Sequence, residues 1–185
     1  MTPRMTSDEI ALFTALLRSA NTYLEFGCGG STALAAEMVQ SVTSVESSAE
    51  WLLQVEAACK PAAARLIHVD IGPTGNWGMP TDPATRDRWP AYHQKVWAEP
   101  GASNADLFFV DGRFRIACFM QAVLICRPDA LIAIHDYALR PAYHAVEQFA
   151  RPVASVGELA IFVRRPSFNV ADANALLIKH AFDPA

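Results

Sequence analysis

Short apolar runs alternate with longer amphipathic stretches along most of the chain, and this pattern predicts strands that alternate with helices. The run at 105–112 is nearly all apolar, as expected for a central parallel strand that is buried on both faces. The five predicted parallel strands are Tyr23–Phe26, Ser41–Glu46, Arg65–Asp70, Ala105–Gly112 and Ala130–Ile134.

The stretches between these runs predict helices. In the first of them, residues 7–20, apolar side chains recur on one face, and Thr6 with Glu9 fits a capping box. Two short runs around Gly157-Glu158, 153–156 and 159–164, predict an antiparallel hairpin. The other predicted helices cover 31–40, 48–60, 113–127, 139–150 and 171–182.

Residues 71–101 interrupt the alternation with a cluster of glycine, proline and three tryptophans. Within this insert, 83–98 predicts helix that is broken or kinked at Pro90. Long loops at the ligand end of a sheet often act as lids. The sequence leaves open whether the aromatic side chains of the insert line a pocket or cover the edge of the sheet. These residues are Trp77, Trp89, Tyr92, His93 and Trp97.

Composition narrows the class of protein. Hydrophobic residues make up 52% of the 185 residues and charged residues 18%, which indicates one compact domain, 1–185, that carries the insert. The net charge of -4 offers no basic footprint for nucleic acid, although Arg113 and Arg115 lie close together. The four cysteines form no CxxC pair, and no signal peptide or membrane-length apolar run is visible. We therefore expect a cytoplasmic protein without membrane or nucleic-acid partners.

A glycine-dense turn joins the first strand to the next helix. Gly27, Gly29 and Gly30 allow a ligand to lie against the main chain. The free N–H groups at the start of the helix, near Ser31, favour polar or anionic ligand groups. Glu25 adds a negative charge at the carboxyl end of the strand, where open α/β sheets bind ligands.

A second acid follows at the end of the next strand. Glu46 lies 17 residues beyond Gly29, and a right-handed βαβ unit would place its carboxylate beside the glycine turn. There it could accept hydrogen bonds from two ribose hydroxyls. These two strand ends together predict a nucleoside-containing cofactor.

The run Glu25-Phe26-Gly27-Cys28-Gly29 resembles motif I, acid-x-Gly-x-Gly, of the class I S-adenosylmethionine (SAM) dependent methyltransferases. The resemblance implies a doubly wound, Rossmann-like α/β fold whose mostly parallel seven-stranded sheet ends in an antiparallel hairpin. It implies SAM as cofactor and S-adenosylhomocysteine as product, with Glu25 near the ammonium-bearing methionine part. Asp70, at the end of the third strand, corresponds to a position near the adenine.

Val110-Asp111-Gly112 and His135-Asp136-Tyr137 end the fourth and fifth strands, and they resemble the small O-methyltransferase-like branch of this family. The resemblance implies that Asp111 contributes to cofactor binding and that Asp111, His135 and Asp136 are catalytic. Members of this branch often hold a divalent metal on carboxylates at these strand ends. They usually carry Asp-Asn where this chain has Asp136-Tyr137, so we expect no metal here, with a divalent ion as the open alternative.

The function expected from these residues is methyl transfer to an oxygen of a small-molecule acceptor. His135 is the best candidate for the base, because its unperturbed pKa lies near neutrality. Trp77 and Tyr137 are predicted substrate contacts, and exposed tryptophans in the insert would favour a homodimer.

Two other functions stay open. A nicotinamide-dependent oxidoreductase would also use a glycine turn and a ribose acid, but its fingerprint requires a third glycine where this chain has Thr32. A non-catalytic binding module on the same fold is the other alternative, because fold does not fix function.

Overall fold

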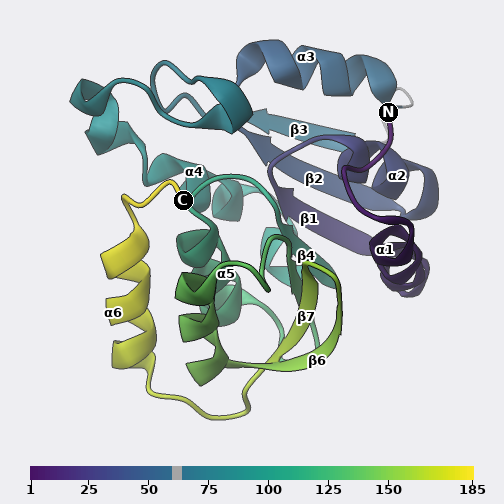
Figure 1. The fold of residues 1–185 in the computed structure, drawn as a ribbon, viewed down its shortest axis with the longest axis vertical. Coiled ribbons are helices and arrows are strands. Elements are labelled where there is room, and N and C mark those ends of the chain that lie inside the picture. The colour runs from purple at the N-terminus through teal and green to yellow at the C-terminus, as the bar shows by residue number, and fades with distance from the viewer. Residues whose placement is uncertain (60–63) are drawn as a thin grey trace.

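The computed structural model describes residues 1–59 and 64–185, and it contains one seven-stranded sheet in the order β3-β2-β1-β4-β5-β7-β6 (Figure 1). Strands β1 to β5 pair in parallel, whereas β7 pairs antiparallel with both β5 and β6. The predicted sheet and its closing hairpin are therefore confirmed. The strands are β1 Thr22–Phe26, β2 Ser41–Glu46, β3 Ala64–His68, β4 Leu107–Val110, β5 Leu131–Ile134, β6 Ala150–Val156 and β7 Leu159–Arg164.

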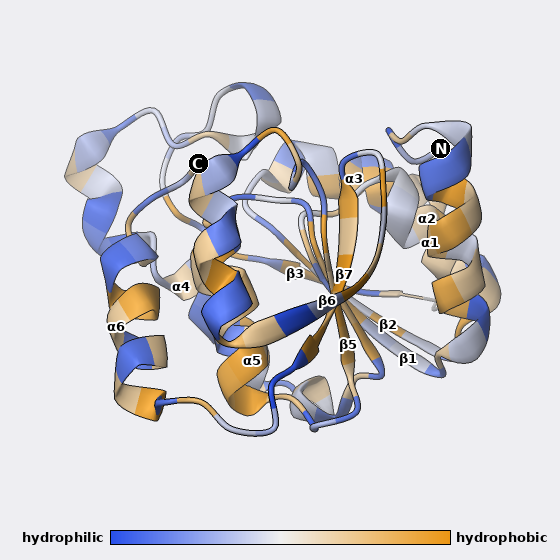
Figure 2. Cartoon of the chain, turned by 60° about the horizontal axis from the view of Figure 1, so that its bottom comes forward, coloured by the Kyte–Doolittle hydropathy of each residue, from blue (hydrophilic) through white to orange (hydrophobic). Residues whose placement is uncertain are grey.

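Helices cover both faces of this sheet. Figure 2 shows α1, α2 and α3 on one side of the strands and α4, α5 and α6 on the other. The capping box predicted for the first helix is present, because Thr6 Oγ1 accepts from the Glu9 N–H and the Glu9 carboxylate accepts from the Thr6 N–H. The α-helices are α1 Ser7–Ser19, α2 Gly30–Met38, α3 Ala49–Ala58, α4 Ala91–Gln94, α5 Arg115–Ile125 and α6 Val170–His180.

Alternating residues of each central strand enter two separate cores. Phe109 of β4 packs with Phe13 of α1, and their ring centroids are 4.9 Å apart. Its neighbour Phe108 points to the opposite face and joins the core beneath α5 and α6. Because successive side chains of a strand point to opposite faces, a strand between two helical layers must be apolar throughout.

Two regions differ from the sequence-based prediction. Residues 141–148 form the 3-10 helix η5 rather than an α-helix, and β6 begins at Ala150, three residues earlier than predicted. Pro152 lies inside β6, which is tolerated because β6 is an edge strand. The predicted helix at 113–127 begins only at Arg115, because Phe114 adopts a left-handed φ of 54°.

The 71–101 insert places the aromatic side chains of its second half in the core, on the face of the sheet that carries α5 (Figure 2). It contains the short helices η1 Asn76–Gly78, η2 Pro83–Arg88, α4 and η3 Lys95–Ala98. Trp89, Tyr92 and His93 are each at least 91% buried, and Trp97 packs against the same core. Only Trp77 among the predicted aromatic set is largely exposed, at 71%.

None of the helices in the described parts of the chain is both long enough and apolar enough to cross a membrane. All four cysteines are free thiols.

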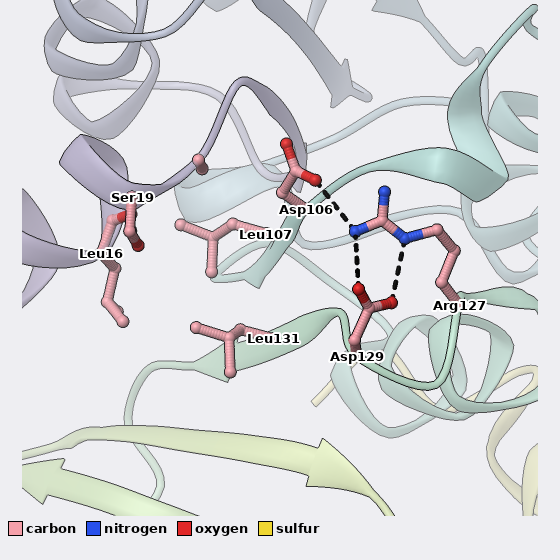
Figure 3. A pocket seen from close by; sticks show the side chains of 8 residues that line it. Leu16, Ser19, Asp106, Leu107, Arg127, Asp129 and Leu131 are labelled. Atoms are coloured by element: carbon pink, nitrogen blue, oxygen red, sulfur yellow. Dashed lines mark hydrogen bonds and ion pairs between the residues drawn. The ribbon is translucent and has the colours of Figure 1, made fainter.

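A cavity of about 260 Å³ lies at the amino ends of the parallel strands, between α1 and the starts of β4 and β5 (Figure 3). The charged side chains that line this cavity are already paired with other groups of the protein. Asp106 Oδ2 accepts hydrogen bonds from the backbone N–H groups of Asn21 and Thr22, and Arg127 pairs with both Asp106 and Asp129. The carboxylate of Asp106 therefore ties β4 to the start of β1.

We expect Asp106→Ala to lower the free energy of unfolding by about 1–3 kcal/mol, because it leaves backbone donors without a partner. Asp129→Ala removes the exposed partner of the same arginine and should change stability by no more than about 0.5 kcal/mol. Urea unfolding of both variants measures this difference. Equal losses would show that the pairing with Arg127 matters more than the two backbone hydrogen bonds.

Candidate functional site

The glycine turn after β1 is pressed against the end of β4. Gly27 has a φ of 98°, and a Cβ added there would lie 2.5 Å from the Cα of Gly112. Only glycine combines this backbone conformation with such a close approach. In contrast, a Cβ added at Gly29 would meet no described heavy atom within 4 Å. The turn is therefore closed on the Gly27 side and open on the Gly29 side.

Glu25 lies behind this turn and is fully buried. Its Oε2 accepts from the Tyr23 hydroxyl at 2.7 Å and from the Ser31 hydroxyl at 2.8 Å, while Thr32 donates to Oε1. Thr32 Oγ1 in turn accepts from the Gly29 N–H at 2.8 Å. Burial raises the pKa of Glu25 to about 7, although these hydrogen bonds oppose the shift. Glu25 thus holds the glycine turn and the first residues of α2 in place through hydrogen bonds from Ser31 and Thr32.

Glu46 ends β2 beside the same turn and is buried. Its Oε1 accepts from the N–H groups of Ser47 and Ser48 at 2.7 and 2.9 Å, which orients the carboxylate. Its Oε2 contacts only the Cys28 thiol, at 3.7 Å, among the described residues. Burial, followed by the charges of Glu46 and Glu25, raises the pKa of that thiol, so it stays neutral. One oxygen of Glu46 therefore keeps accepting capacity for a ligand hydroxyl.

The ends of β4 and β5 bring three predicted residues together. His135 Nδ1 lies 3.4 Å from Asp111 Oδ1 and 3.5 Å from Asp136 Oδ1. One potential ligand atom from each of these residues lies within 4.8 Å of the other two. Asp136 holds a left-handed φ of 58°, an uncommon conformation that tends to occur at functional sites. The structure thus assembles the carboxylates and the imidazole that the sequence placed at two strand ends.

Two arginines that the sequence did not single out as site residues complete this cluster. Arg115 Nη2 lies 3.2 Å from Asp111 Oδ1 and 3.0 Å from Asp136 Oδ2. Arg140 Nη2 also pairs with Asp136 Oδ2, at 3.0 Å. The sequence feature that could have pointed to Arg115 is its position shortly after Asp111-Gly112. No feature of the sequence pointed to Arg140.

A third carboxylate reaches His135 from α1. Glu9 Oε1 lies 3.7 Å from His135 Nε2 and also accepts from the Glu158 N–H. Burial lowers the pKa of His135, but the hydrogen bond and charge of Asp111 and the charges of Asp136 and Glu9 raise it more. The net pKa therefore lies above the ordinary value, which stabilises the imidazolium form. The sequence showed Glu9 only as a capping residue.

The remaining predicted residues lie around or outside these two clusters. Asp70 is exposed and pairs with Arg88 at 3.2 Å. The Tyr137 hydroxyl donates to Glu147 at 2.5 Å, and the Tyr137 ring packs against Phe162. Among the described residues, no hydrogen bond or ion pair joins either side chain to the glycine turn or the His135 cluster.

The N-terminal segment lies on the glycine turn. A Cβ added at Gly30 would lie 2.1 Å from the Thr2 carbonyl, and the Arg4 guanidinium lies 4.4 Å from the centre of the Trp77 ring. Gly78, next to Trp77, is close to Glu46. Residues before α1 and the first part of the insert thus meet beside Gly30, the first residue of α2, and Glu46, the last residue of β2.

Comparison with known proteins identifies the fold. No protein-family model and no curated protein sequence matches this chain. A methyltransferase-like protein from Silicibacter pomeroyi DSS-3 has 33% sequence identity over 98% of this chain and 97% of that one, with a TM-score of 0.89.

Two further solved structures share the fold at low identity. A TehB-like SAM-dependent methyltransferase from Corynebacterium glutamicum ATCC 13032 is 11% identical over 83% of this chain and 87% of that one (TM-score 0.54). Precorrin-6y C5,15-methyltransferase from Geobacter metallireducens GS-15 is 13% identical over 90% and 94% (TM-score 0.53).

The pKa of Glu25 predicts a pH dependence of stability. Between its unfolded value of 4.5 and the folded value of about 7, the native state keeps a proton that the unfolded state has lost. This contribution to stability is fully present below pH 4.5 and is lost as the pH rises through about 7. The expected loss approaches 3 kcal/mol, since one pKa unit corresponds to about 1.4 kcal/mol.

Urea unfolding from pH 4.5 to 8 measures this effect. The side chain of Glu25→Gln stays neutral at every pH. The free energy of unfolding of the wild type, relative to this variant, should therefore fall as the pH rises from 4.5 to 8. Glu56→Gln, on the exposed face of α3, should leave the pH profile unchanged. Parallel profiles for wild type and Glu25→Gln would show that folding does not shift the pKa of Glu25.

Proposed function

Because this chain belongs to the class I SAM-dependent methyltransferase family, we propose that it transfers the methyl group of SAM to an oxygen of a small-molecule acceptor. The observation that carries the proposal is the alignment of two clusters along one edge of the sheet. The glycine turn and Glu46 follow β1 and β2, whereas Asp111 and His135 follow β4 and β5. Open α/β sheets bind ligands at this edge.

Adjacent strands place the two clusters side by side. The Asp111 N–H donates to the Phe26 carbonyl at 3.0 Å, and the His135 N–H donates to the Val110 carbonyl at 3.1 Å. The Gly27 N–H donates to the Val45 carbonyl of β2 at 2.9 Å. Together with the contact between Gly27 and Gly112, these bonds hold the four strand ends in one continuous row. A cofactor bound at β1 and β2 would therefore present its reactive end toward β4 and β5.

The residues at the glycine turn fit the cofactor. The open face at Gly29 allows close approach of a ligand, the first N–H groups of α2 can donate to it, and Glu46 Oε2 can accept from a ribose hydroxyl. Bound SAM supplies an electrophilic methyl group on a sulfonium. The protein has to align the acceptor with that group and exclude water, which is catalysis by proximity.

We assign His135 to the removal of the acceptor proton. Asp111 and Asp136 face Nδ1, and Glu9 faces Nε2, so the ring is held between carboxylates on three different elements. These charges stabilise the imidazolium that forms when the ring accepts a proton. Trp77 remains the proposed acceptor contact on the insert, because its ring is exposed near Gly78 and Glu46.

Cofactor binding is the first test. Isothermal titration should detect binding of SAM and S-adenosylhomocysteine but not of NAD or NADP. Gly29→Ala should leave the unfolding free energy nearly unchanged, because its Cβ points into open space, yet weaken SAM binding at least about tenfold by blocking the close approach. Glu46→Gln should weaken it about 10-fold to 100-fold, since hydrogen bonds to a charged group contribute about 1.5–3 kcal/mol.

Gly27→Ala is the matched comparison. It meets the Gly112 backbone and has a positive φ, so it should lose stability as well as SAM affinity. Failure of the wild-type protein to bind SAM or S-adenosylhomocysteine would refute the proposed function. A signal with NAD or NADP would instead support a nicotinamide enzyme.

The role of His135 predicts a pH dependence. The base must be deprotonated, so kcat should rise with pH through the elevated pKa of His135. Glu9→Gln removes one of the charges that raise this pKa and should therefore lower the midpoint. His135→Gln should reduce kcat by about 10²-fold to 10⁴-fold.

Nuclear magnetic resonance titration of the histidine rings measures the same midpoint without an acceptor. The His135→Gln spectrum assigns the signal. A midpoint at or below 6.5 in the wild-type protein would contradict the predicted direction.

A further inference from the structure

We propose that the Arg115 guanidinium takes the place of a divalent cation between the carboxylates of Asp111 and Asp136, so that this site works without a metal. The inference deepens the proposed function and rests on it for the catalytic consequence. The ion pairs on which the inference is based do not depend on which acceptor the protein methylates. We further propose that Arg115 is a positioning residue for His135.

The donor set alone would suit a metal. Asp111, His135 and Asp136 offer two carboxylates and an imidazole within 4.8 Å of one another, and both carboxylates are about one-third exposed. Carboxylate oxygens suit magnesium or manganese, and imidazole suits several transition metals. Whether the cluster can hold an ion therefore depends on what already neutralises its charge.

Arg115 provides that neutralising charge from inside the protein. Its side chain is 4% exposed, and one nitrogen, Nη2, bridges Asp111 Oδ1 and Asp136 Oδ2 at 3.2 and 3.0 Å. An arginine pairs strongly with carboxylates because its charge and its donors lie in one rigid plane. A metal bound to the same two oxygens would lie against this guanidinium.

The guanidinium is also fixed by backbone acceptors. Nε donates to the Gly112 carbonyl at 3.0 Å, Nη1 to the His135 carbonyl at 2.6 Å, and Nη2 to the Asp111 carbonyl at 3.2 Å. Moving Arg115 aside would break these bonds and leave a buried charge without partners, which is costly. An incoming metal would have to overcome both the repulsion and this loss.

The charge balance of the site includes a second arginine. Arg140 Nη2 pairs with Asp136 Oδ2 at 3.0 Å, so two guanidinium groups face the two carboxylates. With Glu9 on the other side of His135, three carboxylates face two guanidinium groups, so one net negative charge is left beside a neutral imidazole to attract a divalent ion. Because Arg115 holds both the His135 carbonyl and the carboxylates that face its ring, it also sets the position of the proposed base.

Manganese binding tests this inference without an acceptor. We expect no binding heat and no change in melting temperature when the wild-type protein is titrated with millimolar Mn²⁺. Arg115→Met removes the positive charge. This variant should bind Mn²⁺, and its melting temperature should rise when Mn²⁺ is added. Arg115→Lys keeps a cation and should bind no Mn²⁺.

The positioning role is tested by the ring titration of His135. Arg115→Met should shift the His135 midpoint relative to wild type, and Arg115→Lys should restore most of it. A change in stability alone would not produce this pattern.

Two outcomes would overturn the proposal. The first is wild-type Mn²⁺ binding that Asp136→Asn abolishes. The second is a folded Arg115→Met that still binds no Mn²⁺, since the arginine would then not be what excludes the ion. If Arg115→Met does not fold, Mn²⁺ binding by the wild-type protein that Asp136→Asn abolishes still overturns the proposal.

SAM titration of the same samples separates this test from the proposed function. A wild-type protein that binds neither SAM nor Mn²⁺ would refute the methyltransferase function and leave the assignment of Arg115 standing.

Discussion

The contact between Gly27 and Gly112 is the constraint on which the site depends. Each residue would place an added Cβ within 3 Å of the other's backbone, so neither can carry a side chain without a shift of β1 against β4. Tyr92, from the insert, closes the same point from above, because its hydroxyl lies beside Gly112. Close packing here brings the glycine turn after β1 next to Asp111 after β4, and so joins the cofactor side of the sheet edge to the side that carries His135.

Buried charge is handled differently on the two sides of this contact. Glu25 has no cationic partner among the described residues, and three hydroxyl groups surround it instead, so burial raises its pKa to about 7. His135 and Arg115 lie among carboxylates, where each charge has a partner. The first arrangement shapes a turn, and the second concentrates groups that can exchange a proton. This contrast follows from hydrogen-bonding chemistry, because hydroxyls can organise a carboxylate without neutralising it.

Much of the fold could be predicted because its signals are local. The capping box at Thr6, the apolar run of β4 and the turn at Gly157 each specify one element through neighbouring residues. The predictions were less accurate where distant contacts decide. The insert forms short helices because Trp89 and Tyr92 bury against Phe114, and no periodic pattern encodes that packing. At β6, the strand extends back past Pro152, and only the place of β6 at the sheet edge makes this proline acceptable.

The sequence by itself determined the order of strands and helices, the glycine turn, and the strand-end positions of Glu46, Asp111 and His135. Parallel pairing then makes those strand ends neighbours. Spacing predicted Glu46 as a candidate site residue, and the resemblance to a known family predicted Asp111 and His135. Only the tertiary structure decided which charges surround His135. Glu9 arrives from the first helix and Arg140 from a segment after β5, while Arg115 turns back from α5 onto both carboxylates. Side-chain direction and charge pairing between distant elements depend on how the helices pack on the sheet, and no local pattern carries that information.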